Sequence, residues 1–280
     1  MLAYRHLFHA GNFADVFKHA LLAQLVQALA KKDKPFFCLD THAGIGRYDL
    51  AHDWARKNAE YKNGIARVWG RGDAPTEMLP YLDAVRAENP DGKLNFYPGS
   101  PRIMRGFMRA HDRLALTELN KKDGETLARL FAGDRQVEVR LLDGYQALKA
   151  FLPPPERRGL VLVDSSFDRA QEFKRLTDGF AGGYRKFATG VYALWYPLME
   201  PIAMHAFERR VAATGIRKIL QLELAVRNLG FSGSVRGCGM LIANPPFGFE
   251  AAARKILAWL WPVLSQDGEG EERVRWLAPE

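Results

Sequence analysis

Acidic residues end four of the apolar, strand-like runs in this sequence, and they are the groups best placed to do chemistry. They are Asp40, Glu118, Asp143 and Asp164. The carboxyl ends of parallel strands meet at one edge of a sheet, so we expect these side chains to converge on one crevice. A single acidic residue in such a place is usually the cap of the next helix. Four in this order favour a cofactor crevice.

The loop after Asp40 has glycines at positions 44 and 46, which let backbone amides approach a ligand closely. Its spacing, Asp-x-x-x-Gly-x-Gly, is neither the complete dinucleotide fingerprint nor a nucleotide-triphosphate loop. It suits an adenosyl cofactor without phosphates, such as S-adenosylmethionine. Glu118 would then bind a ribose diol, and Asp143 with Gly144 the adenine amino group. A plain strand-to-helix turn and a nicotinamide dehydrogenase are the alternatives.

Two segments could hold an amine that receives a methyl group. Asn244-Pro245-Pro246-Phe247 matches the Asn/Asp-Pro-Pro-aromatic motif of amino-methyltransferases, whereas Asp164-Ser165-Ser166-Phe167 matches only its first and last positions. The chemistry needs an acceptor side chain, a backbone carbonyl and a ring that stacks on the base. Asp164 ends the strand after the one that ends at Asp143. Asn244 ends the last strand, which runs antiparallel in a methyltransferase-type sheet, so strand order favours Asp164.

Helices and strands alternate along the chain and must position these groups. Apolar spacing predicts a helix over 13–30, with Asn12 as its N-cap. The polar, proline-containing stretch 52–92 is interpreted as an inserted helical subdomain, and 265–273 as a mobile segment. The alternation predicts an α/β fold with a doubly wound, mostly parallel sheet. Strands are expected at 36–40, 94–97, 114–118, 137–142, 160–163, 191–196, 219–224 and 239–243.

Composition limits the classes of protein that the chain can represent. Its 280 residues allow one large domain, and its net charge of +8 favours a nucleic-acid partner over a membrane. The two cysteines, Cys38 and Cys238, lie in strand-like runs, which is a reduced, cytoplasmic pattern. We see no signal peptide and no apolar run of about 18 residues. His6, His9, His19 and His42 lack the spacing typical of a zinc site, so no metal is expected.

Several motifs in this sequence resemble the bacterial 23S ribosomal RNA adenine-N6 methyltransferases called large-subunit methyltransferase J. They are 4–19 (YRHLFHAGNFADVFKH), 39–48 (LDTHAGIGRY) and 97–101 (YPGSP), followed by Glu118-Leu119 and Asp143-Gly144-Tyr145. The resemblance covers the whole chain. It implies a single Rossmann-like domain over 1–280, with a seven-stranded sheet whose last strand is antiparallel. It also implies S-adenosylmethionine as cofactor and N6 of one adenine in 23S rRNA as the methylated atom.

The resemblance also assigns site residues. Asp164 corresponds to the catalytic acceptor and Tyr4 to a substrate contact. We add His6, Lys18 and Phe167 as expected RNA contacts, with Tyr4 and His6 covering the pocket. The cofactor site is implied to contain His19, His42, Ser100, Glu118, Asp143, Gly144 and Asp164.

One departure from the family bears on activity. The family has Asp-Pro-Pro-Tyr where this chain has Asp164-Ser165-Ser166-Phe167. The carboxylate and the ring remain, but two fixed φ angles and one hydroxyl are lost. We therefore expect a slower enzyme, and a catalytically weakened or inactive RNA-binding relative is the alternative.

An arginine row is a candidate surface for RNA phosphates. Arg102, Arg105, Arg109 and Arg113 recur every three or four residues, which would place them along one face of the helix after Pro101. A solvated helix face is the alternative interpretation. N6 chemistry on one base does not require a dimer, so a monomer is expected.

Overall fold

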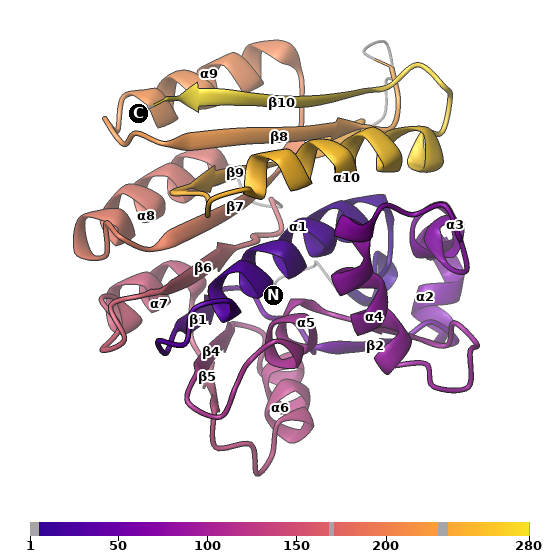
Figure 1. Ribbon diagram of the computed structural model, residues 1–280, viewed down its shortest axis with the longest axis horizontal. Helices are drawn as coiled ribbons and strands as arrows, with labels where there is room; N and C mark the ends of the chain where they lie inside the picture. The colour runs from indigo at the N-terminus through magenta and orange to yellow at the C-terminus, as the bar shows by residue number, and fades with distance from the viewer. Residues whose placement is uncertain (1–5, 168–170, 229–234, 280) are drawn as a thin grey trace.

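The computed structural model describes residues 6–167, 171–228 and 235–279. Its centre is a sheet with the strand order β10-β8-β9-β7-β6-β1-β4-β5 (Figure 1). The seven strands expected from the resemblance become eight in the described part of the chain. They are β1 (Phe37–Asp40), β4 (Arg113–Glu118), β5 (Val137–Leu141), β6 (Gly159–Val163), β7 (Val191–Leu198), β8 (Ile219–Ala225), β9 (Gly237–Ala243) and β10 (Glu271–Ala278).

Strand direction separates the two motifs that competed in the sequence. Strands β5, β4, β1, β6 and β7 are parallel neighbours. Strand β9 lies between β7 and β8 and is antiparallel to both, as expected. Asn244, which follows β9, therefore lies at the opposite edge of the sheet from Asp164, which follows β6.

The eighth strand corrects the expectation of a mobile segment over 265–273 for its last part, 271–273. Strand β10 pairs antiparallel with β8, from Glu271 opposite Ala225 to Ala278 opposite Ile219. Its charged, mostly exposed sequence is typical of a protected edge strand and hides the strand pattern. Arg275 fixes it further, because its guanidinium donates to Gln221 Oε1 at 2.7 Å.

Helices cover both faces of the sheet, as expected for a doubly wound fold (Figure 1). The buried side chains of α7, α8 and α9 belong to one hydrophobic cluster, and those of α1, α4, α5 and α10 to a second one. The helices are α1 (Phe13–Ala30), α2 (Asp53–Asn58), α3 (Ile65–Val68), α4 (Leu79–Ala87), α5 (Ser100–Gly106), α6 (Lys121–Leu130), α7 (Gly144–Phe151), α8 (Glu172–Lys186), α9 (Pro201–Ala212) and α10 (Phe249–Leu264).

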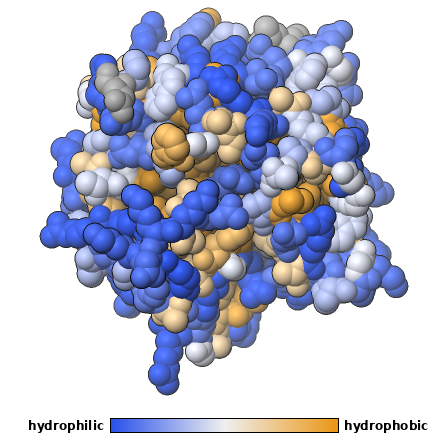
Figure 2. Space-filling view, in the orientation of Figure 1, coloured by the Kyte–Doolittle hydropathy of each residue, from blue (hydrophilic) through white to orange (hydrophobic). Residues whose placement is uncertain are grey.

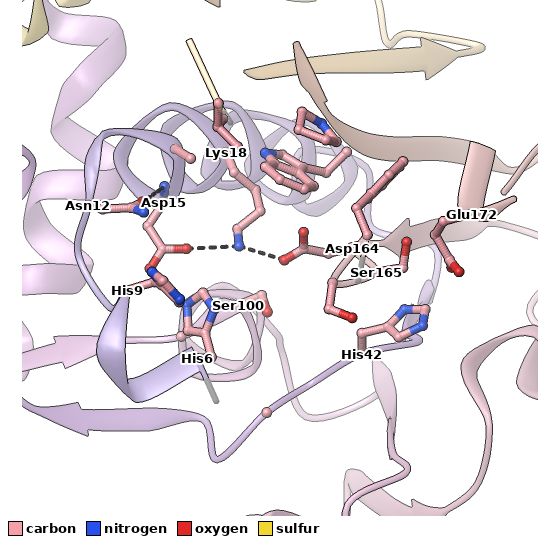
Figure 3. A pocket seen from close by; sticks show the side chains of 18 of the residues that line it. His6, His9, Asn12, Asp15, Lys18, His42, Ser100, Asp164, Ser165 and Glu172 are labelled. Atoms are coloured by element: carbon pink, nitrogen blue, oxygen red, sulfur yellow. Dashed lines mark hydrogen bonds and ion pairs between the residues drawn. The ribbon is translucent and has the colours of Figure 1, made fainter. Parts of the chain in front are cut away.

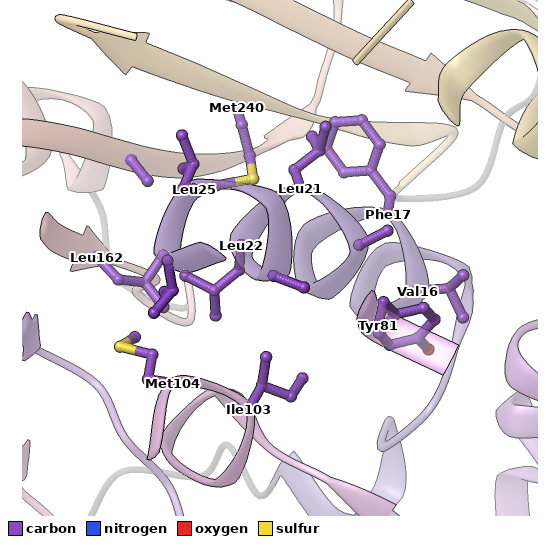
Figure 4. Close-up of a cluster of buried hydrophobic side chains, with 14 of the residues drawn as sticks. Val16, Phe17, Leu21, Leu22, Leu25, Tyr81, Ile103, Met104, Leu162 and Met240 are labelled. Carbon is purple, nitrogen blue, oxygen red and sulfur yellow. The ribbon is translucent and has the colours of Figure 1, made fainter. Parts of the chain in front are cut away.

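Helix α1 begins where the sequence predicts. The side chain of Asn12 accepts a hydrogen bond from the Asp15 amide at 3.0 Å and satisfies one free donor of the first turn. The helix is buried on more than the one face expected of an amphipathic helix. Phe17, Leu21 and Leu22 are fully buried, because α1 contacts α4, α5 and α10 as well as the sheet (Figure 4).

The strand expected at 94–97 does not join the central sheet. Instead β3 (Phe96–Pro98) pairs antiparallel with β2 (Arg47–Asp49) in a separate two-stranded sheet. The amide of Gly99 donates to the carbonyl of Gly46 at 2.9 Å, which draws the segment to the glycine loop. Helix α5 begins at the next residue, Ser100, so β3 ends there and is too short to reach the central sheet.

Short helices fill the stretch between β2 and β3. Besides α2, α3 and α4 there are 3-10 turns at η2 (Glu60–Asn63) and η3 (Thr76–Met78), and η1 (His6–Phe8) precedes α1. Ile65, Tyr81 and Val85 pack in the same cluster as α1. The interpretation of 52–92 as an inserted subdomain of one methyltransferase domain stays a prediction.

The face of the molecule drawn in Figure 2 is mostly hydrophilic. Apolar side chains form small groups between the hydrophilic ones. No helix in the described ranges is long and apolar enough to cross a membrane.

Candidate active site

A cavity of about 970 Å³ opens between α1 and the carboxyl ends of the parallel strands (Figure 3). Tyr4 lies outside the described residues, so the structure says nothing of its place. The cavity brings together the other residues that the sequence and the resemblance single out. They are His6, Lys18, His19, His42, Ser100, Glu118, Asp143, Gly144, Asp164 and Phe167.

A buried lysine connects α1 to the end of β6. The Nζ atom of Lys18 lies 2.5 Å from Asp164 Oδ2 and 2.9 Å from Asp15 Oδ1. Asp15 Oδ2 in turn accepts a hydrogen bond from the Gly11 amide and lies 2.9 Å from His6 Nε2. The ammonium is therefore shared by two carboxylates in a place with little water.

Burial alone would favour the neutral forms of this network. It lowers the pKa of Lys18, but the attraction of Asp15 and Asp164 outweighs it, and the pKa lies above its ordinary value. Burial likewise raises the pKa of Asp15, and the charges of His6 and Lys18 bring it well below its usual range. Lys18 and Asp15 are thus both ionised at neutral pH. Asp15 was not predicted as a site residue. Its spacing of three residues from Lys18 on a predicted helix could have indicated their ion pair.

His19 presents one unused ring nitrogen. Its Nδ1 lies 2.8 Å from the Tyr97 hydroxyl, which is itself 3.1 Å from the hydroxyl of Tyr81. Its Nε2 is buried and has no hydrogen-bond partner among the described residues. Burial holds the pKa of His19 well below its ordinary value, so the ring is neutral. A buried polar atom without a partner at a cavity wall fits a site for a polar ligand.

The glycine loop after β1 is fixed by Glu118. One oxygen of this carboxylate accepts from the Gly44 amide at 3.0 Å and the other from the Asn120 amide at 2.7 Å. Gly44 has φ +61, and a Cβ there would lie 2.3 Å from the Tyr48 hydroxyl, so the position requires glycine. Burial raises the pKa of Glu118.

Asp40 lies beneath the same loop and is fully buried. Burial raises its pKa to about 7, a hydrogen bond with Ser100 opposes the shift, and repulsion from Asp164 adds to it. One oxygen of Asp40 accepts from the His42 amide at 3.3 Å. Of the four strand-end acids, Asp40 is thus the one that supports the loop from below and does not line the cavity.

Asp143 caps a helix and lines the cavity at the same time. Its Oδ1 accepts from the amides of Tyr145 and Gln146 at the start of α7, and Arg175 donates to Oδ2 at 3.2 Å. For this residue the cap and the cofactor interpretations are therefore compatible. The next residue, Gly144, lies so close to the glycine loop that a Cβ would stand 2.6 Å from the His42 ring.

The segment after β6 turns sharply into the cavity. Phe167 has φ +53, a strained value for a residue with a side chain. Edge-to-face contacts with Phe173 and Trp195, at centroid distances of 4.8 and 5.9 Å, hold its ring. Ser165 is buried in the same wall, close to Glu172 (Figure 3). The hydroxyl of Tyr145 donates to Glu172 at 2.7 Å, a contact that sequence reasoning did not anticipate.

The Asn244-Pro245-Pro246-Phe247 segment is a structural turn, as strand order predicted. The side-chain amide of Asn244 donates to the carbonyls of Ala188 and Gly190 at 2.8 Å each, just before β7 begins. Phe247 is fully exposed at this far edge of the sheet.

The expected arginine row does not exist. Helix α5 ends at Gly106, so Arg109 lies in the following loop and Arg113 in β4. Each of the four arginines is paired with a carboxylate. The pairs are Arg102 with Glu88, Arg105 with Asp134, Arg109 with Asp112 and Arg113 with Glu156. These charges hold the fold together and form no free phosphate surface.

Within the described ranges, no group of three or more His, Cys, Asp or Glu side chains is placed to hold a metal ion. The two cysteines are buried, and burial raises the pKa of both thiols.

Comparison with known proteins decides the family. The family model described as "Ribosomal RNA large subunit methyltransferase D, RlmJ" matches residues 33–278. The chain belongs to this family. Proteins named "Ribosomal RNA large subunit methyltransferase J" from Escherichia coli (strain K12) and Haemophilus influenzae (strain Rd) are 44% and 42% identical to it. Each alignment covers all of this chain and all of the relative.

A solved relative supports the fold. The crystal structure of a Legionella pneumophila protein superposes with a TM-score of 0.89 at 36% identity, covering 96% of this chain and 98% of the other. The resemblance read from the sequence motifs is thus confirmed at the level of the RlmJ family and its methyltransferase fold. The roles of single side chains remain predictions.

Proposed function

We propose that this protein transfers a methyl group from S-adenosylmethionine to the N6 amine of one adenine in 23S ribosomal RNA. Membership of a family of large-subunit rRNA methyltransferases supports the reaction class. The observation that carries the proposal is the place of Asp164 at the carboxyl end of β6, inside the cavity and paired with buried Lys18. A carboxylate held there can accept a hydrogen bond from an exocyclic amine.

The cavity residues fit an adenosyl cofactor. S-adenosylmethionine supplies an electrophilic methyl group when bound. His19, through its unpartnered Nε2, and Ser100 would bind its polar amino-acid end, while Glu118 would bind the ribose hydroxyls. Asp143 and Gly144 would hold the adenine beside His42. The carboxylates that line the cavity, the neutral imidazole and the close-fitting glycine together favour a ligand with hydrogen-bond donors and no phosphate.

Asp164 would position the target amine in the transfer step. Lys18 occupies Oδ2, and no described residue donates a hydrogen bond to Oδ1, so that oxygen can accept one from the N6 amine. Held in this way, the N6 amine would face the methyl group that the bound cofactor supplies, with its hydrogen on Asp164 Oδ1 until solvent water takes the proton. Methyl transfer of this kind depends mostly on orientation. The backbone carbonyl of Ser165 and the ring of Phe167 would fix the amine and the base.

The remaining expectations belong to the same proposal. Tyr4 and His6 would cover the adenine pocket, and His6 already contacts the Asp15–Lys18 network. One chain supplies all the predicted site residues within the described ranges, which supports a monomer. With ribosomal RNA as substrate, the protein would act in the cytoplasm.

Calorimetric titration with S-adenosylhomocysteine, with NAD as comparison, tests the cofactor. Incubation of unmodified 23S rRNA with labelled S-adenosylmethionine, followed by nucleoside mass spectrometry, tests the reaction. We expect S-adenosylhomocysteine to bind, N6-methyladenine to form, and Asp164→Asn to abolish its formation while the protein stays folded. NAD binding instead would indicate a dehydrogenase. RNA binding without methylation would indicate an inactive relative.

A further inference from the structure

Two aromatic rings from distant segments form a stack at the surface. The rings of Phe8 in η1 and Trp54 in α2 lie nearly parallel, at an interplanar angle of 12° and a centroid distance of 5.1 Å. His52, which caps α2, contacts the indole edge-on. Even so, 43% of Trp54 remains exposed. A large aromatic side chain held rigid but left half open is suited to contact with a ligand.

The stack adjoins the cavity on both of its segments. Phe8 lies between His6 and His9, which line the cavity, and η2 after α2 contributes Glu60 to the same wall. Glu60 also ties the two segments together. One of its oxygens lies 2.9 Å from His9 Nδ1 and the other accepts from Asn12 at 3.0 Å. The two rings of the stack therefore belong to segments that also line the cavity.

Exposed cations without carboxylate partners follow Trp54 along the same segment, in α2 and η2. Arg56, Lys57 and Lys62 are exposed, and within the described ranges none of their side chains has an acidic partner. They differ in this from the arginines of α5 and its neighbours, which are all paired. Free cations beside an exposed aromatic ring are the combination that binds single-stranded nucleic acid, through phosphates and base stacking together.

We propose that Phe8, Trp54, Arg56, Lys57 and Lys62 form a binding surface for unpaired nucleotides that flank the methylated adenine. This inference rests on the proposed function, because it takes the cavity as the adenine pocket. An adenine that enters a cavity leaves its stack, and its neighbours lose a stacking partner. The indole can replace that partner without reading the sequence, while the cations hold the backbone.

The test compares Trp54→Leu, which keeps apolar bulk but removes the aromatic face, with Trp54→Phe, which keeps a ring. We expect Trp54→Leu to raise the KM for unmodified 23S rRNA about ten-fold, and Trp54→Phe to raise it much less. The kcat at saturating RNA and the Kd for S-adenosylhomocysteine should stay unchanged in both variants. An unchanged KM in Trp54→Leu, or an equal rise in both variants, overturns the stacking role.

Salt dependence tests the cations. Arg56→Ala/Lys57→Ala should reduce the slope of log affinity against log salt by about 1.4, because each lost phosphate contact on a single strand contributes about 0.7. The matched control, Lys31→Ala/Lys32→Ala, removes two exposed lysines just beyond the far end of α1, which spans 18 residues or roughly 27 Å. A slope that falls equally in the control assigns the effect to net charge and overturns the surface.

RNA binding measured without cofactor separates this inference from the proposed function. If the wild type neither binds S-adenosylhomocysteine nor methylates RNA, the proposed function fails. The surface still stands in that case if Trp54→Leu weakens binding of a labelled single strand. Competition by an RNA duplex as strong as that by the single strand would overturn it.

Discussion

The ammonium of Lys18 lies 2.5 Å from one carboxylate oxygen of Asp164, a residue 146 positions further along the chain. This contact joins the first long helix to the end of β6 across the candidate active site. It engages only one of the two oxygens, and the proposed amine would bind the other.

Lys18→Met should destabilise the protein strongly. The substitution keeps the apolar stem but leaves Asp15 and Asp164 as buried carboxylates without their cation, and breaking a buried pair costs roughly 3–5 kcal/mol. Guanidinium unfolding measures the change, and Lys32→Met, at an exposed position, serves as control. A loss below about 1 kcal/mol would show that the network adds little to stability. Adding Asp15→Asn should restore part of the loss.

Asp40 should make stability depend on pH in the direction opposite to ordinary carboxylates. Its folded pKa, about 7, lies above the ordinary value of 3.8, so the folded state holds a proton that the unfolded state has released. The free energy of unfolding therefore falls as pH rises from about 4 to 7. A shift of this size corresponds to roughly 4 kcal/mol.

Asp40→Asn removes this dependence. The variant should gain stability relative to wild type at pH 8, and the difference should vanish near pH 4. Denaturant unfolding across that range measures it, with the exposed carboxylate in Asp33→Asn as control. A variant that is less stable than wild type at pH 8 would contradict the raised pKa.

Gly144→Ala should weaken cofactor binding at least ten-fold. The added Cβ would lie 2.4 Å from the Thr41 carbonyl and 2.6 Å from the His42 ring, so the glycine loop must move. Gly106→Ala is the matched control, since a Cβ there meets nothing within 4 Å. Calorimetry with S-adenosylhomocysteine should separate the two. Equal affinities would mean that the loop moves without consequence for the ligand.

Ser165→Pro/Ser166→Pro should speed methyl transfer. Proline fixes φ and removes backbone freedom that serine must lose on ordering, an effect on the order of 1 kcal/mol per site, or about five-fold in rate. Single-turnover methylation measures the change. Ser165→Ala/Ser166→Ala removes the hydroxyls without restricting φ and should not speed the reaction. A double-proline variant that transfers the methyl group more slowly than wild type would contradict this prediction, because the serines would then give the faster reaction.

The sequence predicted the parts of the fold that follow from local pattern. The first helix with its Asn12 cap, the parallel strands and the placement of Asp164 and Asn244 at opposite edges of the sheet all follow from periodicity and strand order. Strand β10 was not predicted, because an exposed edge strand carries charged residues where a central strand carries apolar ones. The prediction of an arginine row was wrong. Local spacing shows neither that α5 ends at Gly106 nor that the arginines pair with remote carboxylates such as Glu88.

The burial of α1 has a consequence for the growing chain. The helix is made before the sheet, yet it packs against α10, which follows the other described helices in the chain. Until α10 is made, Phe17 and Leu21 stay partly exposed. The nascent chain then carries an apolar helix to which chaperones can bind. The ion pair of Lys18 with Asp164 likewise forms only after β6 has been made. The candidate active site is thus assembled late in synthesis, and a chain truncated before α10 should be cleared by proteases before it could act on RNA.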